Sequence, residues 1–138
     1  MAVSELATGP VSVIRSFLRL NLTWNSGAAF GVANSATTAL SIFGIAFACA
    51  TLYLSRDLTS KSWGIAAGLI VGGITGNLHD RIFRSWGSGF LQGQVVDWIQ
   101  LPHWPVFNLA DTSIVIAAVL ILILTFLNIP PKDAEAMK

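Results

Sequence analysis

In a chain of 138 residues, 54% apolar and only 11% charged residues are far from the balance of an ordinary soluble domain, so the sequence predicts a membrane protein. The net charge of +1, carried by dispersed Lys and Arg residues, argues against a nucleic-acid partner, because phosphate binding needs a clustered basic face. Cys49 is the only cysteine, which excludes an internal disulfide.

Three stretches without any charged residue are long enough to cross a bilayer as helices. They cover residues 20–55, 62–79 and 112–131. A hydrocarbon core of about 30 Å needs roughly 17 to 25 apolar residues in helical conformation. The sequence therefore predicts a mainly α, integral membrane helical bundle that forms a single membrane domain over residues 1–138.

The first 36 residues are mixed in composition and precede the predicted spans. Strand-forming residues are frequent between Val11 and Trp24, and from Phe17 onward polar residues alternate with apolar ones. This pattern predicts one or two short strands. We expect residues 1–36 to lie outside the membrane.

The predicted spans cover about residues 37–55, 63–78 and 109–128. The second span contains five glycines, some with small-xxx-small spacing. Such spacing lets helices approach closely in lipid, so close packing is expected on this face.

Basic residues give the expected orientation of the spans. Arg56 and Lys61 lie in the turn between the first two spans, and Lys132 follows the third. The positive-inside rule places these ends in the cytoplasm. The tail over residues 129–138 is then cytoplasmic, and the loop over residues 79–108 faces outside.

Four short segments place polar residues at predicted span ends on one side of the membrane. They are Asn-Ser-Gly-Ala-Ala-Phe-Gly at 25–31, Gly-Asn-Leu-His-Asp-Arg at 76–81, Val-Val-Asp at 95–97 and Phe-Asn-Leu-Ala-Asp at 107–111. Acidic residues at such a depth are costly and tend to face a cavity and serve function. Asp80, Asp97 and Asp111 are therefore candidate functional residues.

Two neighbouring carboxyl groups have the chemistry to hydrolyse an amide. When two carboxylates lie a few ångströms apart, one of them keeps a proton. The ionised group can take a proton from water while the protonated group hydrogen-bonds the scissile carbonyl. No metal or other cofactor is expected, because a catalytic zinc needs three protein ligands and neither His79 nor His103 has closely spaced partners.

The four segments, in this order and with matching hydropathy between them, resemble the motif set of the lipoprotein signal peptidases, also called signal peptidase II. The resemblance runs from about Val11 to Asn128. It implies a four-helix protein of the bacterial plasma (inner) membrane with a small extracytoplasmic β-cradle and an amphipathic surface segment.

The resemblance also implies an activity. The expected enzyme is an intramembrane aspartic endopeptidase that cleaves diacylglyceryl-modified prolipoproteins just before the lipidated cysteine, at the extracytoplasmic side. Its expected partners are this prolipoprotein substrate, membrane lipid and inhibitors of the globomycin type.

Matching the motifs position by position assigns roles to individual residues. The catalytic pair falls on Asp97 and Asp111, and Asp80 corresponds to a supporting position, as a partner for Arg81. The residues expected in the substrate site are Asn25, Gly27, Asn77, Arg81 and Asn108. For Asn25 and Asn108 the alternative to substrate contact is that they satisfy turn or cap geometry. For Gly27 the alternative is a role in backbone conformation.

One departure from the family pattern bears on activity. The family carries a first helix with an Asp-Gln-x-x-x-Lys-like element before the cradle, and this chain begins where that helix should be ending. We therefore expect three spans here against four in the family. The alternative to an active enzyme is an inactive or truncated homologue that acts only as a membrane binding partner.

Overall fold

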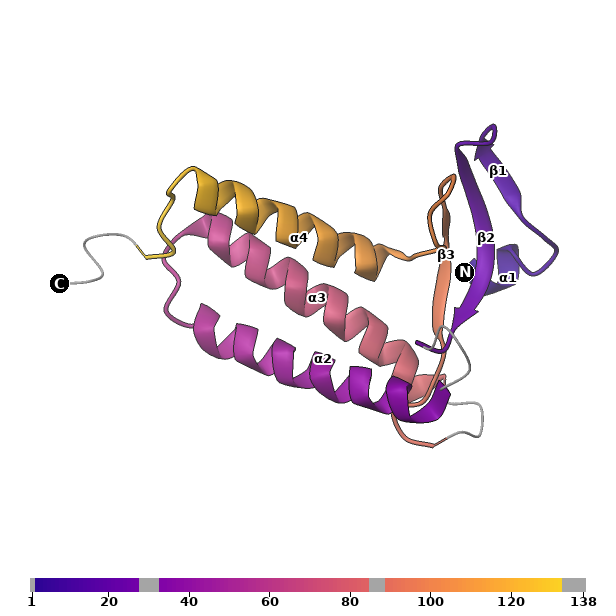
Figure 1. Cartoon of the computed structure of the whole chain (residues 1–138), viewed down its shortest axis with the longest axis horizontal. Helices are drawn as coiled ribbons and strands as arrows, with labels where there is room; N and C mark the ends of the chain where they lie inside the picture. The colour runs from indigo at the N-terminus through magenta and orange to yellow at the C-terminus, as the bar shows by residue number, and fades with distance from the viewer. Residues whose placement is uncertain (1, 28–32, 85–88, 133–138) are drawn as a thin grey trace. The chain divides into compact units, whose positions relative to one another are not determined.

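The computed structural model of the chain describes residues 2–27, 33–84 and 89–132 (Figure 1). In chain order its elements are α1 (Ala2–Glu5), β1 (Val11–Ile14), β2 (Leu18–Asn25), α2 (Ala33–Ser55), α3 (Lys61–Phe83), β3 (Val95–Gln100) and α4 (Leu109–Phe126). The prediction of a mainly helical protein with a small sheet is confirmed.

The chain divides into two compact units. The sheet unit comprises Met1–Ser41 and Leu78–Leu109, and the helix unit comprises Ile42–Asn77 and Ala110–Lys138.

The sheet unit contains one antiparallel sheet with the strand order β1-β2-β3 (Figure 1). Of the one or two short strands predicted in the N-terminal segment, two are present, β1 and β2. In the pairing of β2 with β3, Thr23 lies opposite Asp97 and Asn25 lies opposite Val95. This register brings the start of the first motif beside the third motif, about 70 residues later in the chain.

The strand β3 corrects the sequence prediction, which placed these residues in an irregular loop over 79–108. Its first three residues, Val95, Val96 and Asp97, are all buried. A strand that is covered on both faces does not alternate apolar with polar residues, so the period-two signal is weak. The predicted amphipathic surface segment stays a prediction.

The helix unit holds the adjoining parts of α2, α3 and α4. Gly73 of α3 allows α4 to approach closely, because a Cβ atom there would lie 2.5 Å from the Ala110 carbonyl oxygen and 2.6 Å from Cγ1 of Ile114. At the other end of α4, Trp63 Nε1 donates a hydrogen bond of 2.9 Å to the Ile129 carbonyl. The two helices therefore run antiparallel along one another.

Among the described residues, two helical segments are long and apolar enough to cross a membrane, Thr37–Ser55 and Leu109–Phe126. They carry large exposed apolar side chains, including Leu54 at 70% and Leu122 at 68% exposure, which suits contact with lipid. The helix α3 is not one of the two, and it contains five glycines together with charged residues at both of its ends. Its crossing of the membrane stays a prediction.

The bounds of α3 also differ from the prediction. The helix ends at Phe83 rather than near residue 78, so residues 79–81 of the second motif, predicted in the loop, lie on the same helix as residues 76–78. Asn77, Asp80 and Arg81 consequently follow helical spacing. Because the last part of α3 is polar, no apolar periodicity in the sequence predicted that it is helical.

Candidate active site

Asp97 lies in β3 with only 1% of its surface exposed. Each of its carboxyl oxygens accepts a hydrogen bond from an asparagine amide. Asn25 Nδ2 donates to Oδ2 at 2.8 Å, and Asn108 Nδ2 donates to Oδ1 at 2.7 Å. Burial of a carboxyl group is costly unless it is hydrogen-bonded, and the two asparagines supply such bonds from both sides.

The amide of Asn25 is held in one orientation by its own turn. Its Oδ1 accepts a hydrogen bond of 2.7 Å from the backbone N–H of Gly27, as in an Asx-turn. Because the amide oxygen is used in this way, the amide nitrogen faces Asp97. Asn25 is exposed, whereas Asn108 is only 6% exposed.

A hollow of about 310 Å³ opens beside Asp97 in the sheet unit. Its lining comes from the end of β2, from β3 and from the segment before α4. The lining residues are Thr23, Trp24, Asn25, Ser26, Asp97, Pro105 and Val106. A buried acid thus lies at the wall of a space large enough for part of a peptide or lipid.

Arg81, only 8% exposed, joins separate segments of the sheet unit. Its Nη1 donates to the carbonyl of Gly93 at 2.9 Å and to that of Asn25 at 3.2 Å. Gly27 adopts a φ of +77°, and a Cβ atom on it would lie 2.8 Å from Arg81 Nη2. Glycine therefore lets the backbone of the first motif pass directly over the guanidinium group.

Asp80 forms its salt bridge with Arg84, at 2.6 Å, and its Oδ2 accepts a hydrogen bond of 3.0 Å from the backbone N–H of Val96. The sequence predicted Arg81, the next residue in the chain, as the partner of Asp80, and that pairing stays a prediction beside the contact with Arg84. Since α3 continues through this region, residues four apart share a face and residues one apart do not. Asp80 thereby links α3 to β3.

In the helix unit, Asp111 lies in the first turn of α4 and Asn77 near the end of α3. Asn77 Nδ2 donates a hydrogen bond of 2.8 Å to Asp111 Oδ1. Gly76 permits this approach, because a Cβ atom on it would already lie 3.1 Å from the Cβ of Ala110. A negative charge in the first turn also interacts favourably with the helix dipole.

The predicted site residues thus fall into two groups, each within one unit. The sheet unit holds Asp97 with its two asparagines and the pair of Arg81 and Gly27, and the helix unit holds Asp111 with Asn77. Residues 28–31 of the first motif lie outside the described residues. The described part of the chain contains no group of three or more His, Cys, Asp or Glu side chains that could hold a metal ion.

One contributor, Gly93, was missed by sequence reasoning. Its backbone N–H donates to the Arg81 carbonyl at 3.0 Å, and a Cβ atom on it would lie 2.5 Å from the carbonyl oxygen of Asp80. A lone glycine between two glutamines gives no sequence signal for such an approach. A second miss is Thr37, whose hydroxyl donates to the Ser26 carbonyl.

The chain was compared with known protein families and with curated proteins. The family model described as signal peptidase (SPase) II matches residues 1–127. Three relatives, each called lipoprotein signal peptidase, come from Rhodococcus jostii, Streptomyces coelicolor and Mycolicibacterium smegmatis. They are 39%, 43% and 40% identical, over 98%, 88% and 98% of this chain. The chain spans 68%, 59% and 61% of their respective lengths.

Two solved structures are similar to the chain, and both are described as bacterial membrane enzymes determined by the in meso method. The structure at 2.3 Å resolution gives a TM-score of 0.72 at 27% identity, covering 95% of this chain and 84% of that one. The structure at 1.9 Å resolution gives a TM-score of 0.72 at 30% identity, covering 84% of this chain and 74% of that one.

Proposed function

This chain belongs to the signal peptidase II family, and from that premise we propose that it is an aspartic endopeptidase that removes signal peptides from diacylglyceryl-modified prolipoproteins. The proposed cleavage takes place just before the lipidated cysteine, at the extracytoplasmic side of the bacterial plasma membrane. The observation that carries the proposal is the setting of Asp97, a buried carboxyl group whose two oxygens each accept an asparagine amide beside an open hollow.

The second catalytic residue in the proposal is Asp111. The covalent chain supports cooperation of the two acids, because Asn108, which donates to Asp97, precedes Asp111 by only three residues. Three residues of extended chain span at most about 11 Å. The partner of Asp111, Asn77, belongs to the same motif as Arg81.

The two acids are proposed to share the roles of base and acid. Both accept amide hydrogen bonds, Asp97 from Asn25 and Asn108 and Asp111 from Asn77. In the proposed reaction the ionised acid of the pair takes a proton from water as the water oxygen attacks the scissile carbonyl carbon, and the protonated acid hydrogen-bonds the carbonyl oxygen. The proton taken from water then passes to the leaving amine as the C–N bond breaks.

The remaining site residues are proposed to hold the substrate. The amide of Asn25 lies at the exposed edge of the hollow, where a peptide backbone can reach it. Arg81 donates to the carbonyl of Asn25, which lines the hollow, and Gly27 gives the guanidinium group room to do so. A globomycin-type inhibitor is proposed to compete for the same space, and membrane lipid surrounds the helices α2, α3 and α4, all three of which cross the bilayer in this proposal.

The proposal is tested with the chain in lipid vesicles and a diacylglyceryl-modified prolipoprotein, by following release of the signal peptide on gels. Asp97→Asn and Asp111→Asn are each expected to reduce cleavage to background, while globomycin blocks cleavage by the unchanged chain. Asp57→Asn is the matched control, because Asp57 is exposed in the turn after α2, and it should cleave normally.

Two results would count against the proposal. Cleavage by either Asp97→Asn or Asp111→Asn would overturn the two-aspartate mechanism. Absence of cleavage by both the unchanged chain and the Asp57→Asn control, with both inserted in the vesicles, would favour a membrane binding partner without protease activity.

A further inference from the structure

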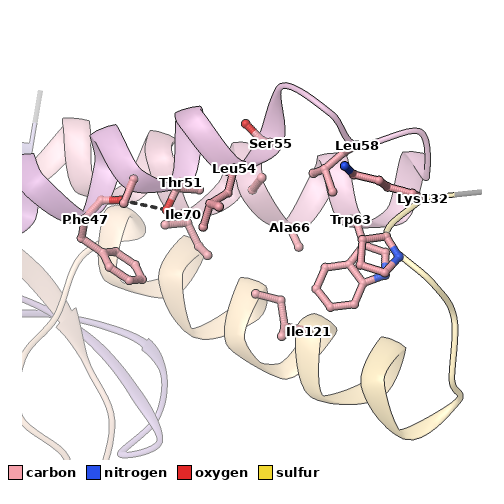
Figure 2. A pocket seen from close by; sticks show the side chains of 13 residues that line it. Phe47, Thr51, Leu54, Ser55, Leu58, Trp63, Ala66, Ile70, Ile121 and Lys132 are labelled. Carbon is pink, nitrogen blue, oxygen red and sulfur yellow. Dashed lines mark hydrogen bonds between the residues drawn. The ribbon is translucent and has the colours of Figure 1, made fainter. Parts of the chain in front are cut away.

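A second pocket, of about 400 Å³, lies in the helix unit (Figure 2). Phe47 and Leu54 of α2, Ile70 of α3 and Ile121 of α4 contribute apolar side chains to its wall. Ala66, which is completely buried, also lines it. The wall therefore combines apolar groups from all three long helices.

At one end of this pocket the turn after α2 contacts the segment after α4. The backbone N–H groups of Thr59 and Ser60 both donate to the Pro131 carbonyl, each at 3.3 Å. The indole ring of Trp63 lines the pocket next to Lys132 (Figure 2), and its N–H is bonded to the Ile129 carbonyl.

The polar groups in the wall are mostly engaged within the chain. The hydroxyl of Thr51 donates to the Phe47 carbonyl at 2.8 Å, drawn as a dashed line in Figure 2, and the hydroxyl of Ser55 donates to the Leu52 carbonyl at 3.0 Å. An occupant therefore meets hydrocarbon along most of the wall. Hydrocarbon burial favours an occupant that is itself an apolar chain.

Lys132 supplies a cation at this end of the pocket. Its ammonium lies 3.5 Å from Asp57, which also lies 3.9 Å from Arg56. Together with Lys61, the described residues of this end carry three cations and one anion, an excess of two positive charges. Lys132 is 44% and Asp57 57% exposed in their side chains, so the ammonium group can reach an external anion.

We propose that this pocket binds an acyl chain of an anionic phospholipid, with the lipid phosphate meeting Lys132. The volume lies in the range of roughly 300 to 1,000 Å³ that is common for ligand pockets. Basic pockets between membrane helices recognise anionic head groups. The adjoining helix ends belong to the membrane-capable helices α2 and α4, so the pocket opens where lipid is the solvent.

This lipid site is separate from the proposed substrate site. Ile121 and Asp111 are ten residues apart on α4, which corresponds to about 15 Å along the helix. The inference depends on the membrane setting of the family and not on the proposed catalysis. Lipid binding and signal peptide release can therefore fail independently.

The test measures lipid retention by native mass spectrometry. The chain, purified in a mild detergent, is mixed with equal amounts of phosphatidylglycerol and phosphatidylcholine that carry the same acyl chains. Phosphatidylglycerol is expected to be retained about fivefold more, because it carries a net negative charge whereas the choline cation of phosphatidylcholine offsets its phosphate, and one basic residue contributes about that factor toward an anionic lipid. Equal retention of the two lipids would overturn the role of Lys132.

Matched variants locate the lipid in the pocket. Ala50→Phe fills the pocket and should abolish retention, whereas Cys49→Phe changes the neighbouring exposed residue outside the lining and should leave it intact. Lys132→Gln should remove the preference for phosphatidylglycerol, and Lys61→Gln should keep it.

Helix content by circular dichroism establishes that each variant is folded. Equal lipid retention by Ala50→Phe and Cys49→Phe would overturn the proposal. A dimer of the unchanged chain that only Ala50→Phe dissociates would also overturn it, because the occupant would then be a second copy of the chain.

Discussion

The two asparagines that bond Asp97 differ in how replaceable they are. Asn108 is nearly buried, so its amide is shielded from water, whereas Asn25 is exposed at the edge of the hollow. Water can take over a hydrogen bond only where it has access. The hydrogen bond from an asparagine amide to Asp97 therefore contributes more to folding stability at position 108 than at position 25.

Replacing Asn108 by alanine is expected to lower the free energy of unfolding by about 1 to 3 kcal/mol, the usual cost of depriving a buried group of its hydrogen-bond partner. Asn25→Ala should cost less than about 1 kcal/mol, because water reaches that side of Asp97. Denaturant unfolding in detergent, followed by tryptophan fluorescence, measures both values. Equal losses in the two variants would show that burial does not govern these bonds.

Gly27→Ala is expected to destabilise the chain by about 1 to 2 kcal/mol, because an L side chain at a φ of +77° is strained. The new methyl group would also press on Arg81. Gly68→Ala is the control, since a Cβ atom there meets nothing within 4 Å, and it should leave stability unchanged or raise it. A thermal unfolding midpoint that falls equally in both variants would contradict this prediction.

At the level of elements, the contact between α3 and α4 depends on which glycine faces the partner helix. Gly73 is buried and faces Ala110 and Ile114, whereas a Cβ atom on the adjacent Gly72 would meet nothing within 4 Å. The position of Asp111, next to Ala110, therefore depends on one glycine of the pair.

Gly73→Ala is expected to displace the start of α4 and to lower the cleavage rate by about a hundredfold, the order of loss that a misplacement of 1 Å produces. Gly72→Ala should cleave at the rate of the unchanged chain. The initial rate of signal peptide release gives both numbers. Full activity of Gly73→Ala would show that the tight approach at this glycine does not position Asp111.

The elements that the sequence predicted well are those with local signals. The apolar length of α2 and α4 and the strand-forming runs of β1 and β2 are visible in short windows of sequence. The strand β3 and the polar end of α3 were not predicted. The residues of β3 pair with β2 about 70 positions earlier, and no local pattern encodes that register.

The same limit applies to the candidate site. The motifs identified the acids and the asparagines by type, but the sequence could not say which asparagine bonds which acid. The bond from Asn25 to Asp97 follows from strand register, and the partner of Asp80 follows from the continuation of α3 to Phe83. Both depend on conformations that the sequence left open.

For the whole molecule, the number of membrane crossings decides on which side each segment lies. If α2 and α3 both cross, the turn that contains Thr59 lies on the opposite side from the far ends of both helices, and its basic residues Arg56 and Lys61 place it in the cytoplasm by the positive-inside rule. Thr23 of β2 and Trp104 before α4 then both face outside, because one crossing separates each of them from the turn. The exposed side chains of these three residues make them accessible to reagents.

This arrangement is testable with single cysteines in a Cys49→Ser background and a membrane-impermeant maleimide. Thr23→Cys and Trp104→Cys should react in intact spheroplasts, and Thr59→Cys only after permeabilisation. The native Cys49, within the span of α2, should react in neither case. Reaction of Thr59→Cys and Trp104→Cys from the same side would show that α3 does not cross.

The attachment of the segment after α4 to the turn before α3 uses backbone atoms on both sides, the N–H groups of Thr59 and Ser60 and the carbonyl of Pro131. Any amino acid offers that carbonyl, and every amino acid except proline offers that N–H group. The side chains at these three positions can therefore change during evolution without loss of these backbone hydrogen bonds. In a saturation mutagenesis library, proline at position 59 or 60 should be the depleted substitution.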